Sequence, residues 1–138
     1  MLPHLRTNTE SENDWFEALM SLARYLRTPD GCPWDREQSV VDFAKYAIEE
    51  AGEYVEALNT NDTTHIREEF GDAFFVLLAS AAAAEEAGLF TLEDALSAAH
   101  EKMVRRHDHV FGEVKAQTAE EATEAWNAAK AQEKEQDG

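Results

Sequence analysis

Residues 64–88, THIREEFGDAFFVLLASAAAAEEAG, decide the fold class of this chain. Within this stretch the twelve residues 73–84 are apolar apart from Ser80, and alanine, leucine and phenylalanine supply most of them. That composition favours a buried helix over a strand, and Gly88 is a typical residue to end it. A membrane span needs about twenty residues. We therefore predict a long, largely enclosed helix of a water-soluble domain.

Helical spacing continues on both sides of this stretch. Apolar residues recur at intervals of three and four, and 23 alanines against nine valines and isoleucines favour helix over sheet. We predict an all-α fold, an antiparallel bundle of four to five helices joined by short loops. The expected helices are 14–26 with Asp14 as N-cap, 39–58, 64–87, 91–107 and 119–133, with loops at 28–35 and 107–112. The 138 residues fit one domain at 13–135, between a flexible N-terminus at 1–12 and a frayed end at 136–138.

The charge balance excludes several classes of function. Twelve lysines and arginines stand against 29 aspartates and glutamates, which gives a formal charge of −17. A protein this acidic lacks the basic surface that nucleic acid polymers and anionic membranes require. The single cysteine, Cys32, cannot form an internal disulfide, and the N-terminus does not resemble a secretory signal. We expect a cytoplasmic protein.

Two carboxylate pairs are the main candidate for a functional site. Glu50 and Glu53 on one predicted helix, and Glu69 and Asp72 on the next, are each spaced three residues apart. This spacing places both members of a pair on one helix face, and the short turn at 59–64 brings the two pairs to a similar depth of a helical hairpin.

Two interpretations of these carboxylates are open. They form solvated helix faces, or they bind a cation, since Arg67 is the only lysine or arginine between residues 47 and 78. The apolar run that follows Asp72 on its own helix favours the cation, because buried carboxylates need compensation. Oxygen ligands suit Mg²⁺ or Mn²⁺ rather than Zn²⁺. Glu49 lies off this face, where it acts as a supporting base or is simply solvated.

Several sequence blocks resemble the MazG family of nucleoside triphosphate pyrophosphohydrolases. The resemblance extends over about residues 15–135. Its blocks are GCPWDREQ at 31–38, EEAGE at 49–53, EFGD at 69–72, KMVRRHDHVFG at 102–112, and Trp126 with Lys130. The order and spacing of the first and fourth blocks make the match specific.

The resemblance implies an all-α fold, usually dimeric, that hydrolyses (deoxy)nucleoside triphosphates to monophosphates and pyrophosphate with Mg²⁺, for which Mn²⁺ is a possible substitute. It implies a role in clearing non-standard or excess nucleotides. By the same resemblance the metal ligands are Glu50, Glu53, Glu69 and Asp72, the phosphate contacts are Lys102, Arg105 and Arg106, and Trp126 and Lys130 lie near the nucleotide. Trp34 either stacks on a base or closes the edge of the core.

Some positions depart from the family pattern. Asp108 stands where the family has proline, and Tyr46 and His65 stand where some relatives carry lysine. His107 and His109 either contact phosphate or, as the favoured interpretation, cap the loop at 107–112. Without a family match, Trp126 would be a packing residue. An alternative function is a non-catalytic helical module that binds nucleotide or metal for regulation. A ferritin-like di-iron protein is excluded, because no Glu-x-x-His spacing occurs. A related pyrophosphohydrolase that acts on phosphoribosyl-ATP would share the carboxylates, and the resemblance of the GCPWD block to the MazG family argues against it.

A homodimer or a higher homo-oligomer is the expected assembly for a physical reason as well. A helix that is apolar all round exposes more surface than one small five-helix chain can cover, and a second copy would cover the rest.

Overall fold

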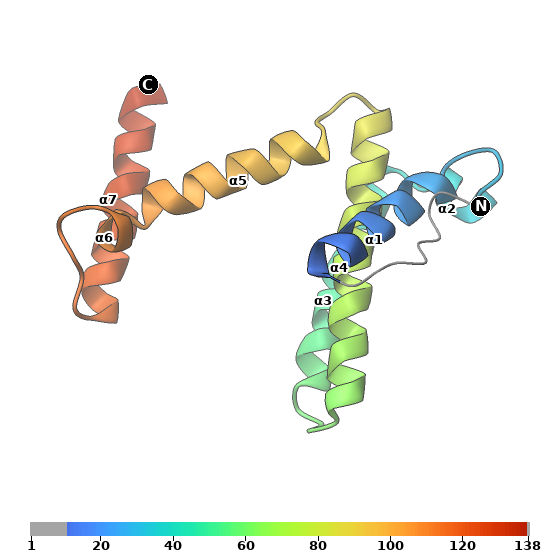
Figure 1. Ribbon diagram of the computed structural model, residues 1–138, viewed down its shortest axis with the longest axis horizontal. Coiled ribbons are helices and arrows are strands. Elements are labelled where there is room, and N and C mark those ends of the chain that lie inside the picture. The colour runs from blue at the N-terminus through green and yellow to red at the C-terminus, as the bar shows by residue number, and fades with distance from the viewer. Residues whose placement is uncertain (1–10, 138) are drawn as a thin grey trace. The chain divides into compact units, whose positions relative to one another are not determined.

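The computed structural model describes residues 11–137, and every regular element among them is a helix. Figure 1 shows their arrangement along the chain. The chain divides into two compact units, the first ending at Leu92 and the second beginning at Glu93. The all-helical class is therefore confirmed. In chain order the helices are α1 (Glu12–Leu26), α2 (Pro33–Glu37), α3 (Val40–Ala57), α4 (Thr63–Glu86), α5 (Leu92–Arg106), α6 (Asp108–Phe111) and α7 (Ala119–Asp137).

Two predicted loops contain short helices. The segment 28–35 was expected to be irregular, yet α2 begins at Pro33, which is favourable at the first position of a helix because that position needs no N–H donor. The segment 107–112 contains the single turn of α6. Both helices span only one turn or slightly more, which is too short for a periodic apolar pattern to reveal them. The predicted flexible N-terminus falls largely on residues 1–10, which lie outside the described residues.

Side chains at the helix starts account for the element boundaries in the first unit. The N-cap of α1 is Ser11, which accepts from the backbone N–H of Asp14, so the predicted N-cap at Asp14 was wrong by three residues. Ser39 and Asp42 form a reciprocal capping box at the start of α3. At the start of α4, Asp62 accepts from two backbone N–H groups. The Asp62 cap fixes the point at which the turn after α3 ends and α4 begins.

Gly88 ends α4 as the sequence predicted. Its φ of 72° is in the left-handed region, which costs glycine little and other residues more. The N–H of Leu89 donates to the carbonyl oxygen of Ala84, and that of Gly88 donates to Glu85. This pair of bonds is the Schellman pattern, which satisfies the last carbonyl groups of the helix.

The core of the first unit is built on the apolar run of α4. One side of the run packs against α1, where Met20 and Ala23 lie in a cluster with Leu78, Ala81 and Ala82. A neighbouring side packs against Phe43 of α3 through Ala79 and Ala83. In Figure 1, α3 and α4 lie side by side and α1 lies across α4. The small alanine side chains let these helices approach closely, so the expected enclosure of this stretch is confirmed on the faces toward α1 and α3.

The GCPWD block forms a structured connection between α1 and α3. A Cβ on Gly31 would lie 2.4 Å from the carbonyl oxygens of Tyr25 and Leu26, so only glycine fits this close approach. Arg27 donates to the carbonyl oxygens of Asp35 and Gln38, at 2.6 and 3.0 Å. Arg27 also pairs with Glu86 of α4. The block is therefore tied to the bundle through arginine.

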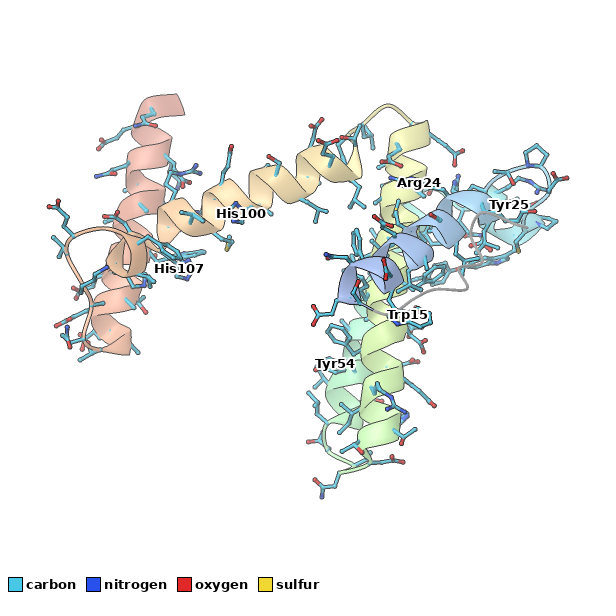
Figure 2. All side chains as sticks on the ribbon, viewed as in Figure 1. Trp15, Arg24, Tyr25, Tyr54, His100 and His107 are labelled. Carbon is cyan, nitrogen blue, oxygen red and sulfur yellow. The ribbon has the colours of Figure 1, made fainter. Side chains whose placement is uncertain are left out.

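Two further hydrogen-bonding contacts join α1 and Leu92 to the end of α4. Arg24 of α1, labelled in Figure 2, donates to the Glu85 carboxylate at 3.0 and 3.2 Å. Oε2 of that carboxylate, which already accepts from Nη2 of Arg24, also accepts from the backbone N–H of Leu92 at 3.1 Å. These hydrogen bonds lower the pKa of Glu85. None of the helices between residues 11 and 137 is both long and apolar enough to cross a membrane.

Candidate functional site

The predicted carboxylates on α3 and α4 meet in the first unit. One carboxylate oxygen from each of Glu50, Glu69 and Asp72 lies within 4.8 Å of the others. Glu50 and Glu69 are partly buried, and Asp72 is exposed. Two neighbouring helices thus bring three of the four predicted metal ligands into one group, as the spacing and the short turn predicted. We call Glu50, Glu53, Glu69 and Asp72 the carboxylate cluster.

Glu53 lies beside this group rather than within it. Its carboxylate is exposed, but it is close enough to Glu50 and Glu69 to raise the pKa of both. Glu49 is exposed and lies outside the group. Glu53 therefore adjoins two members of the close group, and the predicted supporting base, Glu49, lies on the surface.

Two carboxylates of the cluster, Glu50 and Glu69, have raised pKa values. Burial is the largest cause for both Glu50 and Glu69, and repulsion from the neighbouring carboxylates adds to it. His65, one turn before Glu69, places Nδ1 3.7 Å from Oε1 of Glu69 and opposes the rise. Within the described part of the chain no lysine or arginine forms an ion pair with these carboxylates.

One oxygen of the cluster is buried and accepts no donor. Oε2 of Glu69 has no hydrogen-bond partner, and the side chain is only 14% exposed. A buried acceptor without a donor costs free energy unless water or a cation reaches it. This oxygen, together with the oxygen-only donor set, fits a hard divalent cation such as Mg²⁺ or Mn²⁺. Glu50, Glu69 and Asp72 are the residues that could hold one.

Trp34 of α2 is placed against α3. Its ring centroid lies 5.7 Å from that of Tyr46 and 6.1 Å from that of Phe43, while half of the side chain remains exposed. The indole therefore covers an edge of the core and still presents a free surface. Both uses that the sequence suggested, core edge and stacking surface, are compatible with this position.

The predicted phosphate-binding residues lie in the second unit. Lys102 and Arg105 are exposed on α5, and Arg106 at its C-terminal end is largely covered. The Arg106 guanidinium lies over the ring of Trp126 on α7, 5.0 Å from the ring centroid, which is a cation–π contact. Lys130, one turn further along α7, is exposed. The structure thus brings Arg106 and Trp126 together.

Sequence reasoning missed Glu133, which joins these residues. Its carboxylate accepts from Nε of Arg105 at 2.7 Å and from Nη2 of Arg106 at 2.9 Å. These arginines lower the pKa of Glu133 to about 2. Glu133 follows Trp126 by seven residues, so the two lie on nearby parts of one helix face. That spacing was the signal available in the sequence.

The histidines at the end of α5 pack together. Nδ1 of His107 lies 2.6 Å from the carbonyl oxygen of Met103, and its ring contacts those of Trp126 and His109. Figure 2 labels His107 where α5 gives way to α6. These contacts at the end of α5 agree with the loop-capping role that the sequence suggested for His107 and His109.

The fold and site define a class of all-helical proteins with a cluster of acidic residues on a helical hairpin and a basic segment at the end of a following helix. Comparison with known proteins names that class. Residues 38–111 match the MazG nucleotide pyrophosphohydrolase domain. The chain belongs to the MazG family.

Individual relatives agree with this assignment. The chain is 42% identical over 119 residues to the protein YabN of Bacillus subtilis, and 40% identical over 119 residues to the nucleoside triphosphate pyrophosphohydrolase/pyrophosphatase MazG of Thermotoga maritima. Each match covers 86% of this chain, but only 24% of YabN and 45% of the Thermotoga protein. The chain therefore spans less than half the length of these relatives.

A solved structure has the same fold as most of this chain. The crystal structure of a MazG-related protein from Thermotoga maritima has a TM-score of 0.71 and 33% sequence identity to this chain. The match covers 83% of this chain and 98% of that one. The fold expected from the sequence resemblance is confirmed.

Proposed function

We propose that this chain is a divalent-metal-dependent pyrophosphohydrolase that converts (deoxy)nucleoside triphosphates into monophosphates and pyrophosphate. The observation that carries the proposal is the carboxylate cluster of a MazG family domain, whose buried Glu69 oxygen lacks a donor. The Thermotoga relative that bears this activity in its name supports the proposal. Clearing of unwanted nucleotides from the cellular pool is the role we infer for this activity.

In this proposal Glu50, Glu69 and Asp72 hold Mg²⁺, or Mn²⁺ in its place, and Glu53 lies near enough to complete the set. A bound cation of this kind neutralises phosphate charge and lowers the pKa of a coordinated water. The four carboxylates contribute the negative charge that retains the ion, and the surrounding apolar residues of α4 limit their solvation. Glu49 is proposed as a base that assists from the exposed side of α3.

The basic residues bind the phosphates of the substrate. Lys102, Arg105 and Arg106 supply positive charge and N–H donors for phosphate oxygens, and Lys130 adds a further positive charge. Trp126 and Trp34 each offer an aromatic face to a nucleobase, since both remain partly accessible. This division assigns charge recognition to α5 and α7.

We also propose that the chain works as a homodimer. Ile48 on α3, and Phe70 and Leu77 on α4, are 74, 55 and 56% exposed although they are large and apolar. Exposed groups of this size on a small acidic domain are typical of a surface that a second copy covers. Light scattering that gives a monomer mass at micromolar concentration would contradict this part of the proposal.

A direct assay tests the proposed activity. The full chain is mixed with standard, deoxy and chemically altered nucleoside triphosphates in the presence of Mg²⁺ or Mn²⁺, and pyrophosphate and monophosphate are measured. We expect equal amounts of both products from at least one triphosphate, and none after chelation. Release of inorganic phosphate instead of pyrophosphate, or no turnover of any triphosphate, would contradict the proposal and favour a binding module.

A further inference from the structure

Glu133 is a carboxylate shared by two arginines of the second unit. Its Oε1 accepts from Nε of Arg105 at 2.7 Å and from Nε of Arg106 at 3.3 Å, and its Oε2 accepts from Nη2 of Arg106 at 2.9 Å. The Glu133 side chain is 19% exposed. One acidic residue of α7 therefore fixes the last two residues of α5.

Arg106 is held on two sides. Glu133 contacts one edge of its guanidinium, and the face of the same group lies on the Trp126 ring. The Arg106 side chain is 13% exposed, whereas that of Arg105 is 52% exposed. The two arginines therefore differ: one is clamped between an acid and an aromatic ring, and the other is tethered at a single nitrogen.

The contacts with Glu133 leave most arginine donors available. Each guanidinium carries five N–H groups, and Glu133 engages Nε of Arg105 and the Nε and Nη2 nitrogens of Arg106. Within the described part of the chain, Nη1 of both arginines and Nη2 of Arg105 donate no hydrogen bond to Glu133. One negative charge against two positive charges also leaves a net positive charge for an anion. The carboxylate therefore orients the arginines without neutralising them.

We propose that Glu133 is a positioning residue for phosphate recognition, holding Arg105 and Arg106 in the orientation that binds the phosphates of a nucleotide or free pyrophosphate. The proposal rests on the proposed function for the identity of that anion. An arginine fixed in advance loses less conformational freedom when the anion binds, which strengthens binding. Because the pKa of Glu133 is lowered to about 2, the carboxylate stays ionised under the conditions in which the enzyme would act.

Binding of inorganic pyrophosphate to the full chain, measured by calorimetry, tests the proposal without requiring turnover. We expect Glu133→Gln to weaken binding about tenfold, the effect of losing one charge-assisted hydrogen bond. Glu133→Asp keeps the charge and should recover part of the affinity. Glu135→Gln is the matched control, because Glu135 is exposed on the same helix and forms no ion pair within residues 11–137. Its affinity should equal that of the wild type.

Kinetic measurements separate positioning from a purely structural role. In the pyrophosphate-release assay we expect Glu133→Gln to raise KM about tenfold while kcat stays within about twofold. In a background where both arginines are replaced by glutamine, Glu133→Gln should change affinity less than about twofold, because Glu133 acts through them. Circular dichroism checks that each variant folds, and if Glu133→Gln does not fold, the comparison is made with Glu133→Asp.

The outcomes distinguish this inference from the proposed function. Unchanged or tighter pyrophosphate binding by Glu133→Gln would overturn the inference, as would an equal loss in the background without the arginines. If the wild type binds pyrophosphate and shows the expected variant effects but hydrolyses no triphosphate, the proposed function fails and the inference stands. If the wild type hydrolyses triphosphates but does not bind pyrophosphate, the inference fails alone.

Discussion

The carboxylates of the α3–α4 hairpin and the carboxylate of Glu133 on α7 have opposite surroundings. Glu50 and Glu69 face other acids, and burial with mutual repulsion raises their pKa values. Glu133 faces Arg105 and Arg106, which lower its pKa to about 2. The arginines therefore compensate the charge of Glu133, whereas no lysine or arginine in the described part of the chain pairs with Glu50 or Glu69. The uncompensated site is the one where we place the chemistry.

The largest expected effect comes from removing charge at the uncompensated site. Glu50→Gln or Asp72→Asn should reduce metal-dependent pyrophosphate release on the order of a hundredfold or more, because each removes a metal ligand. The folded state should not be destabilised without metal, because the substitutions relieve repulsion. Steady-state kinetics and thermal unfolding measure the two effects.

Glu56→Gln is the matched control for this comparison. Glu56 lies on α3 close to Glu53 in the chain, is exposed, and lies outside the carboxylate cluster. Its replacement should leave turnover unchanged. Wild-type turnover in both Glu50→Gln and Asp72→Asn would show that the hairpin carboxylates are not metal ligands.

A smaller effect should appear in stability when Mg²⁺ is added. A ligand that binds only the folded state stabilises it by about 2.7 kcal/mol at a concentration of one hundred times Kd. We expect Mg²⁺ to raise the unfolding temperature of the wild type at constant ionic strength, and to do so much less for Glu50→Gln. An equal rise in both proteins would assign the effect to general charge screening instead of a site.

The smallest effect is a pH dependence of opposite sign in the two regions. Because the pKa of Glu69 is raised in the folded chain, its ionisation costs stability as pH increases from the usual value of 4.5 to the raised value. Because the pKa of Glu133 is lowered, its contribution is present above about 4.5 and is lost as pH falls toward about 2.

Urea unfolding of the metal-free wild type, Glu69→Gln and Glu133→Gln between pH 3 and 7 measures these contributions. Relative to the wild type, Glu69→Gln should gain stability as pH rises, and Glu133→Gln should lose it. If stability relative to the wild type changed with pH in the same direction for both variants, the charges of Glu69 and Glu133 would not differ in their compensation.

The sequence predicted the first unit better than the second. Periodicity, the alanine-rich run and Gly88 located α3 and α4. The spacing of the two acidic pairs predicted that four carboxylates would meet, and three of them, Glu50, Glu69 and Asp72, form one close group. These are local patterns within one hairpin, where a short turn leaves little freedom in register. Ser11 was missed as the cap of α1 because Asp14, three residues later, is an equally good capping residue type.

Contacts between distant elements were less predictable. Glu133 lies 27 residues from Arg106. Its spacing from Trp126 places the two on one face of α7, but that spacing does not show that this face meets Arg106. The helices α2 and α6 escaped detection because one or two turns carry no periodic signal. The basic residues Lys102, Arg105 and Arg106 could be identified from the sequence. The carboxylate that we propose to orient the two arginines, Glu133, could be identified only from the fold.

Titration of Mn²⁺ into the full chain, with free ion followed by electron paramagnetic resonance, tests most directly whether the hairpin carboxylates take a cation from solution. We expect the wild type and Glu135→Gln to bind at least one ion with the same affinity, and Asp72→Asn to bind it at least about tenfold more weakly. Equal binding by all three proteins, or no binding by the wild type, would contradict the assignment of the metal site to α3 and α4.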